Sequence, residues 1–402
     1  MNIGMVVDNE LDGDVRVRNE AYSLARAGFG VFILCLARGG SPHTEKREGY
    51  TVVRIPRGKK WRNKTFFFAN IIPLFHNYWR LALKAFIKSY HIDVIHAHDL
   101  YMARSACEAA RQQDIPWVLD LHENFPEAVK GYRWASKFPN RWVTRPWRWE
   151  KFEEKYLPKA DRVVLLSENF KNRLLQKYPA LAKEKMVVYS NVPDVEALQS
   201  YPSDKDILPE KGNSKVLFYF GGIAQRRGIY TLIEAHQQLL QKGYDVKLLL
   251  IGPADKAEKS QFLQAIEEGV KVGTIIYHEW KEMVDLPSYI QASDICVSPI
   301  LKNPQHESGI ANKVFQYMLF ERPVVVSDSK PQKDLVEEGG CGLAFRSEDV
   351  EDLAAKTAWL LDHPQEAKEM GEHGEKLVKE KYNSKVMARN LEEMYKKNGA
   401  DV

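Results

Sequence analysis

The sequence lacks the features that mark membrane-spanning, secreted and zinc-binding proteins. No apolar run approaches the roughly 20 residues that a membrane-spanning helix needs, and the chain does not begin with the basic-then-apolar order of a signal peptide. Only four cysteines occur in 402 residues, and none forms a CxxC pair, which argues against a disulfide framework or a zinc site. We therefore expect a soluble, cytoplasmic protein, and its length suggests two domains.

Acidic side chains are scarce in one part of the N-terminal half. Residues 51–100 carry nine basic side chains but only two acids, Asp93 and Asp99. A concentrated basic field attracts anions such as nucleic acid, phospholipid headgroups or a phosphorylated substrate. No recognised nucleic-acid-binding motif accompanies this field, so we expect no nucleic-acid partner.

Short apolar runs alternate with helix-like stretches along most of the chain. Continuous Val, Ile and Leu runs between helices are typical of strands buried on both faces, and so of a parallel sheet. The alternation stops over residues 195–214, where Pro, Ser, Asp, Lys and Gly collect without periodicity, and then restarts. The pattern predicts an α/β fold with two Rossmann-like, doubly wound domains. The apolar runs are residues 3–7, 31–37, 93–98, 116–122, 162–167, 186–190, 216–221, 246–252, 274–278, 295–300, 323–327 and 342–345.

These runs predict an N-terminal domain over residues 1–200 and a C-terminal domain over residues 215–383, with the linker at about 195–214. Residues 384–402 are helix-patterned, and we expect this helix to pack back on the N-terminal domain. Ligands of open parallel sheets bind beyond the carboxyl ends of the strands. We therefore expect the two sheets to face one interdomain cleft.

The loop after the first predicted strand has no GxGxxG pattern, which disfavours a tight dinucleotide turn. Residues 8–16 instead lead into a helix, whose free N–H groups favour an anion. Asp12-Gly13-Asp14 matches the short acidic pattern of metal-dependent transferases, but three-residue matches are common by chance. Asp14 fits better as a helix N-cap, and we expect no metal.

Two later turns carry residues suited to a diphosphate. Gly221-Gly222 lets a ligand approach the backbone closely, and Arg226-Arg227 supplies bidentate donors for phosphate oxygens. Lys313 and Gln316 are three residues apart, so they share one face near the start of a predicted helix. Glu307 precedes that helix and can accept hydrogen bonds from sugar hydroxyls. The alternative for the glycine turn is a plain strand-to-helix turn with no ligand. The alternative for Lys313 and Gln316 is a solvated helix face.

A series of motifs in a fixed order gives the chain a family resemblance. It resembles the retaining nucleotide-sugar glycosyltransferases of family 4, which have the two-domain GT-B architecture, and the resemblance extends over nearly all of the chain. The motifs are Asp14-Val15-Arg16, His96-Ala97-His98-Asp99, Asp120-Leu121-His122-Glu123, Asp161-Arg162-Val163-Val164, Ser167-Glu168, Gly221-Gly222 through Arg227-Gly228, Leu286-Pro287-Ser288-Tyr289-Ile290, Ala292-Ser293-Asp294, Asn312-Lys313 through Met318, Arg322-Pro323-Val324-Val325 and Gly340-Cys341-Gly342.

The resemblance implies roles for the residues at these positions. Arg227 and Lys313 would neutralise the donor diphosphate, with Gly222 and Gly13 beside it, and His122 would reach the donor sugar. The candidate catalytic residues are His122 and Glu307. The ribose and the donor sugar would be bound by Gln316, Ser308, Gly309 and Asn312. Asp14 and Arg16 would lie on the acceptor side.

Two positions depart from the family pattern. Family members usually carry an arginine directly after the first glycine of the turn, where this chain has Gly222. They also carry two glutamates with seven residues between them, which fall here on Ser308, with Glu307 beside it, and on Gln316. Gln316 still hydrogen-bonds a ribose, though it accepts less strongly than a carboxylate.

Two basic, aromatic stretches suggest contact with a membrane surface. They cover residues 59–68 and 132–152, where Trp, Phe and Tyr alternate with Lys and Arg. Rings at headgroup depth and cations on anionic lipid suit a peripheral membrane protein. The alternative is core packing with solvated arginines.

The sequence as a whole therefore predicts a retaining, metal-independent glycosyltransferase. We expect it to move a sugar from a nucleotide-sugar donor, a UDP-sugar rather than a GDP-sugar, to a polysaccharide or lipid-linked glycan acceptor, without a cofactor. Two alternatives remain open: a sugar-nucleotide epimerase on the same fold, and a catalytically silent sugar-nucleotide-binding partner, because Gln316 and Glu307 depart from the family pattern.

Overall fold

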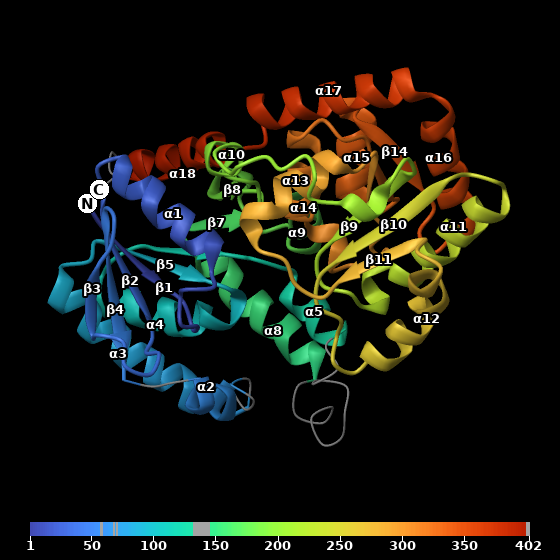
Figure 1. The fold of residues 1–402 in the computed structure, drawn as a ribbon. Helices are drawn as coiled ribbons and strands as arrows, with labels where there is room; N and C mark the ends of the chain where they lie inside the picture. The colour runs from blue at the N-terminus through green and yellow to red at the C-terminus, as the bar shows by residue number, and fades with distance from the viewer. Residues whose placement is uncertain (57–58, 67–68, 70, 132–144, 399–402) are drawn as a thin grey trace. The chain divides into compact units, whose positions relative to one another are not determined.

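The computed structural model describes residues 1–56, 59–66, 69, 71–131 and 145–398, and they fold into two α/β units (Figure 1). Unit 1 consists of Met1–Ser190 together with Met387–Val402, and unit 2 of Asn191–Val386. Each unit is built around one sheet, as the alternating apolar runs predict. No helix in the described ranges is long and apolar enough to cross a membrane.

In the described part of unit 1, eight strands form one sheet in the order β3-β4-β2-β1-β5-β6-β7-β8. All neighbours pair in parallel except β3 and β4. The predicted apolar runs include neither strand of this antiparallel edge pair: β3 is short and polar, and β4 is apolar but was missed. The strands are β1 (Asn2–Val6), β2 (Gly30–Leu36), β3 (Thr44–Lys46), β4 (Tyr50–Ile55), β5 (Val94–His98), β6 (Trp117–Asp120), β7 (Arg162–Leu165) and β8 (Met186–Val188).

Helices α1, α3, α4 and α9 of unit 1 pack against this sheet. The first helix turns Val17, Ala21 and Leu24 inward, and the Asp14 carboxylate accepts a hydrogen bond from the Val17 N–H, which caps it as predicted. The helices are α1 (Val15–Arg26), α2 (Lys59–Phe66), α3 (Leu74–Tyr90), α4 (Ala103–Gln113), α5 (Phe125–Gly131), α8 (Pro146–Tyr156) and α9 (Glu168–Lys177).

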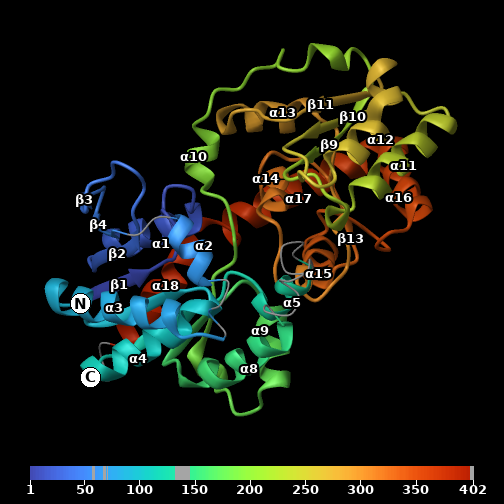
Figure 2. The ribbon, with the colours of Figure 1, turned by 90° about the horizontal axis from the view of Figure 1, so that it is seen from below.

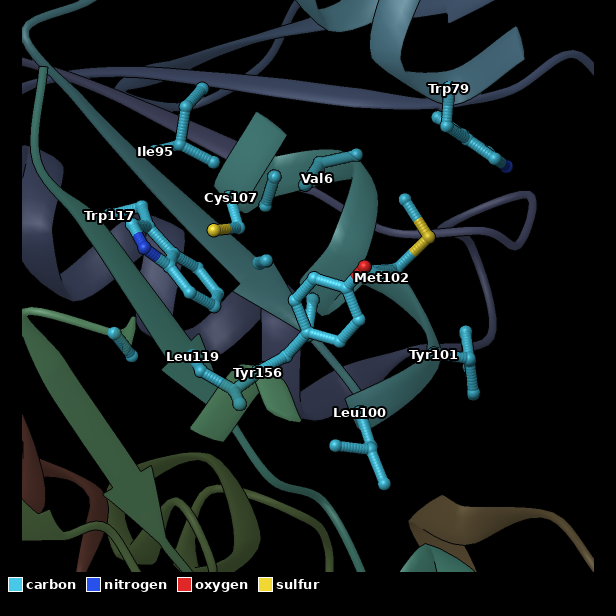
Figure 3. Close-up of a cluster of buried hydrophobic side chains, with 14 of the residues drawn as sticks. Val6, Trp79, Ile95, Leu100, Tyr101, Met102, Cys107, Trp117, Leu119 and Tyr156 are labelled. Atoms are coloured by element: carbon cyan, nitrogen blue, oxygen red, sulfur yellow. The ribbon is translucent and has the colours of Figure 1, made fainter. Parts of the chain in front are cut away.

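A large apolar cluster holds these layers together. Figure 3 shows Val6 and Ile95 from the sheet packed near Cys107, Trp117 and Tyr156. These side chains are almost completely buried, so they supply most of the hydrophobic stabilisation at this face.

The last helix, α18 (Ser384–Asn398), belongs to unit 1 from Met387 onward. Figure 1 shows it beside α1. The Tyr395 side chain is fully buried, its hydroxyl lies 2.7 Å from His96 Nδ1, and its ring lies 5.8 Å from that of Phe29. Helix α18 thus packs within unit 1, against His96 of β5 and against Phe29 just before β2.

Unit 2 has a sheet of six described strands in the order β11-β10-β9-β12-β13-β14, in which every neighbour is parallel. This order is that of a doubly wound fold, since the chain moves outward from β9 in one direction and then restarts at β12 in the other. The strands are β9 (Lys215–Phe220), β10 (Val246–Ile251), β11 (Ile275–His278), β12 (Ile295–Ser298), β13 (Val324–Ser327) and β14 (Gly342–Phe345).

The helices of unit 2 cover both faces of its sheet, and α11 and α16 lie side by side (Figure 2). Part of the segment predicted as a linker is helical, because the Asp194 carboxylate caps a short helix there. The helices are α10 (Val195–Gln199), α11 (Ile229–Gln241), α12 (Lys259–Lys271), α13 (Leu286–Ala292), α14 (Asn312–Leu319), α15 (Lys330–Gly339), α16 (Val350–Asp362) and α17 (Pro364–Glu380).

Gly228 joins the turn after β9 to the segment after β12. It has φ 70°, and a Cβ atom there would lie 1.7 Å from the Pro299 carbonyl oxygen. The Leu301 N–H also donates to the Arg226 carbonyl at 3.2 Å. Only glycine allows this close approach of the two loops.

We expect Gly228→Ala to lower the free energy of unfolding by roughly 2–4 kcal/mol, because it adds backbone strain and a clash. Gly243 is the matched control, since it also has positive φ but a Cβ there meets nothing within 4 Å. Gly243→Ala should cost only the strain, about 1–2 kcal/mol. Urea unfolding of both variants measures the difference, and equal losses would contradict the close approach.

Candidate functional site

Lys313 lies in the first turn of α14, buried beside the glycine turn that follows β9. Its Nζ stands 3.6 Å above the centre of the Tyr219 ring, and a Cβ at Gly221 would lie 3.8 Å from it. The Tyr219 hydroxyl in turn donates to the Gly222 carbonyl at 2.8 Å. Lys313 and the two glycines, predicted separately from sequence, are therefore neighbours.

The surroundings of Lys313 change the pKa of its side-chain amine. Burial and the charge of Arg227 lower the pKa of Lys313 well below its usual value. Among the described residues, no carboxylate lies within ion-pair distance of it. A bound anion would stabilise the protonated form of this buried amine, which lies in the positive field of Arg227.

His306 is a residue of this region to which sequence reasoning assigned no role. Its Nδ1 lies 2.7 Å from the Leu301 carbonyl oxygen and 3.0 Å from Asn303 Nδ2, and its buried Nε2 has no hydrogen-bond partner among the described residues. Burial, together with the charges of Arg227, Arg226 and Lys313, lowers the pKa of His306 to about 4. His306 therefore stays neutral in a positive field.

The remaining predicted donor residues lie on or just before α14. The Ser308 hydroxyl donates to the Pro304 carbonyl at 3.0 Å, Gln316 is buried in the helix, and Glu307 is half-buried in the preceding turn. The helix begins at Asn312, as predicted, and the Asn312 Oδ1 atom is buried without a hydrogen-bond partner in the described ranges. Gly222 is exposed, and a Cβ there would meet nothing within 4 Å.

A second polar cluster occupies the carboxyl ends of β5 and β6 in unit 1. Asp120 accepts from Arg16 Nη2 at 2.8 Å and lies 3.2 Å from His122 Nε2. Burial alone would raise the pKa of Asp120. The charges of Arg16 and His122 outweigh burial and hold this pKa well below its usual value. The Arg16 guanidinium also bonds to the Tyr189 carbonyl, so this residue, predicted for the acceptor side, is bound within unit 1.

His122 is the charged member of this cluster. Burial would lower its pKa, but Asp99 and Asp120 outweigh burial and raise the pKa of His122 to about 9. Its Nε2 lies 3.0 Å from Nδ1 of His98, a residue whose pKa burial and His96 lower to about 3. Neutral His98 and ionised Asp120 therefore share the single Nε2–H of an imidazolium at His122.

Glu20, His96, His98 and Asp120 offer ligand atoms within 4.8 Å of one another, and they are the group of described residues best placed to hold a metal ion. Arg16 already lies 3.0 Å from one Glu20 oxygen and 2.8 Å from one Asp120 oxygen. Burial and the charge of Asp120 raise the pKa of Glu20 well above its usual value. The negative charge of this cluster is therefore neutralised by the Arg16 guanidinium and by a proton on Glu20.

A pocket of about 450 Å³ opens where the loop after β1 meets α2, and Gly13 and Asp14 line it. Arg62 from α2 crosses this pocket to Asp8, with Nε 2.6 Å from Oδ2. Sequence reasoning did not connect Arg62 with the first loop, because the two segments are far apart in the chain.

Two known families match most of the chain. Residues 14–197 match the family described as Glycosyltransferase Family 4, and residues 214–363 match Glycosyl transferases group 1. The chain belongs to the family 4 glycosyltransferases. The resemblance drawn from the sequence motifs is thereby confirmed.

Individual relatives of this glycosyltransferase are distant. It is 26% identical to the capsular polysaccharide biosynthesis glycosyltransferase CapM of Staphylococcus aureus, over 59% of this chain and 61% of that protein, which is less than two thirds of its length. It is 24% identical to an alpha-maltose-1-phosphate synthase of Mycolicibacterium smegmatis, over 76% of this chain and 79% of that protein.

Solved structures show the same fold. A sucrose-phosphate synthase from Thermosynechococcus elongatus superposes with TM-score 0.78 at 19% identity over the whole of both chains. HepE of Anabaena, solved with UDP, superposes with TM-score 0.70 at 16% identity, over 99% of this chain and 100% of that one. The predicted GT-B class is confirmed by these similarities.

The charge on His122 should appear in the pH dependence of stability. Since its folded pKa is raised from 6.5 to about 9, its stabilising contribution is complete below pH 6.5 and is lost as the pH rises through about 9. We expect the stability difference between wild type and His122→Gln to be largest near pH 6 and to shrink above pH 9. Thermal unfolding across this range measures it.

The control for this titration is Asp99→Asn, which removes the charge that contributes most to raising the pKa of His122. Histidine NMR titration should then give a lower pKa for His122 than in wild type. A wild-type value near 6.5 would contradict the charged imidazolium.

Proposed function

We propose that this glycosyltransferase is a retaining, metal-independent enzyme that uses a UDP-sugar. The acceptor is a polysaccharide or a lipid-linked glycan. The observation that carries the proposal is the buried Lys313 ammonium beside the Gly221-Gly222 turn, without a carboxylate partner in the described ranges. HepE, which has been solved with UDP and with UDP-glucose, supports the donor class, and CapM, a capsular polysaccharide biosynthesis glycosyltransferase, supports the acceptor class.

The proposed catalytic contribution is stabilisation of the leaving diphosphate. Arg227 and Lys313 supply positive charge, and the backbone at Gly222 and Gly13 supplies N–H donors in positions that no side chain blocks. Burial strengthens these interactions, because little solvent screens them. A diphosphate bound there restores the ordinary basicity of Lys313, so binding favours the protonated amine.

The sugar end of the donor is assigned to the residues that the sequence predicts for it. Gln316 and Asn312 are assigned to the ribose, and Glu307, Ser308 and Gly309 to the sugar ring. His122, held as an imidazolium by Asp99 and Asp120, donates a hydrogen bond to a sugar hydroxyl. The acceptor hydroxyl then attacks on the face from which the diphosphate leaves, which retains the configuration, and catalysis rests on positioning.

The decisive experiment measures nucleoside diphosphate release from UDP- and GDP-sugars, with and without a lipid or glycan extract. Wild type should release UDP from one donor only when the extract is present. Lys313→Ala should lower kcat/KM at least about 100-fold, since it removes a buried charge from the leaving group. The control is Lys333→Ala, an ion-paired surface lysine on α15, which should not change turnover.

Other outcomes of this experiment would contradict the proposal. Donor conversion without any acceptor would identify an epimerase. Binding of UDP without release, restored to activity by Gln316→Glu, would identify a silent binding protein. Unchanged turnover in Lys313→Ala would remove the diphosphate assignment.

We also propose peripheral contact with the cytoplasmic face of an anionic membrane. Ile71, Ile72, Leu74 and Leu81 are 46–60% exposed around the start of α3, next to the basic helix α2. Leu74 and Leu81 are seven residues apart and so share a helix face. Of the other predicted stretch, residues 132–144 lie outside the described ranges and Trp149 is a core residue, whereas Trp147 is exposed.

We expect wild type to sediment with vesicles containing anionic lipid at low salt and not with neutral vesicles. The double variant Leu74→Ser, Leu81→Ser should lower the bound fraction several-fold, since it removes apolar area from the face. Trp280→Ser removes an exposed apolar side chain from unit 2 and should not change binding. Equal binding by the double variant and wild type would contradict this surface.

A further inference from the structure

The amine of Lys313 is enclosed in unit 2 without a group that balances its charge. The residue is 8% exposed, and its Nζ lies 3.6 Å above the centre of the Tyr219 ring. Among the described residues, neither a carboxylate within ion-pair distance nor a hydrogen-bond acceptor faces this nitrogen. A buried ammonium without such a partner is costly, so these surroundings favour the neutral amine. Burial and the charge of Arg227 lower the pKa of Lys313, in agreement with this geometry.

The neutral amine has a reactivity that the proposed transfer mechanism does not use. In that mechanism Lys313 acts as a cation, and only while a diphosphate is bound. Without the donor, the same nitrogen carries a free lone pair, and a desolvated lysine beside another cation is a nucleophile. The chain therefore presents a nucleophilic amine in the space that the donor leaves.

The charges near this amine favour an anionic product. Arg226 and Arg227 lie in the turn after β9, and the charge of Arg227 acts on Lys313. No acidic side chain occupies the first turn of α14, whose N–H groups form the positive end of the helix. Glu307 in the preceding turn forms no ion pair with Lys313, and His306 is neutral. An anion formed at the Lys313 amine would therefore be stabilised electrostatically, chiefly by Arg227.

The glycine turn leaves room beside the amine. Apart from its chain neighbours, a Cβ at Gly221 would meet nothing nearer than the Lys313 Nζ at 3.8 Å, and a Cβ at Gly222 would meet nothing within 4 Å. An electrophile that arrives with a negative charge would first favour protonation of the amine and so remove its lone pair. The reagent that fits is small, uncharged on arrival and anionic once it is bound to nitrogen. Carbon dioxide has these properties.

We propose that Lys313 binds carbon dioxide as a carbamate when no donor is present, and that the carbamate and the donor diphosphate exclude each other. The Nζ lone pair forms a bond to the carbon atom, the electrons of one carbon–oxygen π bond move to that oxygen, and an amine proton passes to solvent. The new carboxylate pairs with Arg227. Formation of the carbamate is independent of the proposed function, whereas its competition with the donor rests on it.

The first test detects the carbamate on the full chain without any donor or acceptor. The protein is equilibrated with isotopically labelled bicarbonate, carbamates are trapped by a trialkyloxonium reagent, and the modified peptides are identified by mass spectrometry. We expect the peptide that contains Lys313 to carry the trapped group. Exposed lysines should stay unmodified, because an exposed lysine is protonated at neutral pH. A short peptide with a free α-amino group, added to the same sample, shows that trapping works.

Three variants assign the modified nitrogen and its counterion. Lys313→Arg keeps the positive charge but presents a guanidinium, which is not deprotonated in proteins, so the trapped group should disappear. Lys333→Arg makes the same exchange at an ion-paired surface position of α15 and should leave the modification of Lys313 unchanged. Arg227→Gln removes the cation beside the product and should lower the modified fraction several-fold at the same carbon dioxide pressure.

The second test links the carbamate to the donor site. Saturating UDP should remove the trapped group from Lys313, because a bound diphosphate favours the protonated amine. In the transfer assay, bicarbonate at constant pH and ionic strength should act as a competitive inhibitor. At the carbon dioxide pressure that modifies half of the free enzyme, the apparent KM for the donor should rise about twofold with kcat unchanged.

Three results would overturn this inference: no trapped group at Lys313 while the added peptide reacts, equal modification of Lys313 and exposed lysines, or a carbamate that persists while calorimetry shows UDP to be bound. Each of them leaves nucleotide release from the donor untouched. Conversely, a chain that forms the carbamate but releases no nucleotide from any donor would remove the transferase proposal and keep Lys313 as a carbon dioxide site.

Discussion

Parallel strand pairing is the constraint on which both units depend. In a parallel sheet, every strand ends at the same edge, so loops that are far apart in the chain are brought together there. In unit 2 this brings the turn after β9 next to the segment after β12, with the Pro299 carbonyl against Gly228. In unit 1 it brings the ends of β5 and β6 together, and with them His98, Asp120 and His122.

Both units also contain ionisable side chains that are buried away from solvent. Lys313 is buried beside a ring and a glycine turn, with no acid to neutralise it among the described residues. Asp120 is equally buried, but Arg16 and His122 compensate it. The two sites therefore have different roles. The cluster around Asp120, whose charges are paired, stabilises its own unit, whereas the unpaired Lys313 favours binding of an anion.

Much of this arrangement was predictable. The continuous apolar runs predicted buried parallel strands, and the motif series predicted the family. Asp14 as an N-cap and Asn312 as the start of a helix follow from local rules, and both are confirmed. The polar edge strand β3 was missed, since three residues with partly exposed side chains carry no periodic signal. The short capped helix over residues 195–199 was missed because the residues around it are typical of turns.

The sequence by itself determined the fold class, the family and the types of residue at each loop, because these follow from periodicity and from short-range chemistry. Only the tertiary structure decided which of those residues carry charge without compensation. Whether Lys313 meets an acid, whether Arg16 faces a ligand or Asp120, and whether Arg62 reaches Asp8 depend on contacts between residues tens of positions apart. Such contacts fix burial and ion pairing, and these in turn set the protonation state and the kind of ligand that each place can bind.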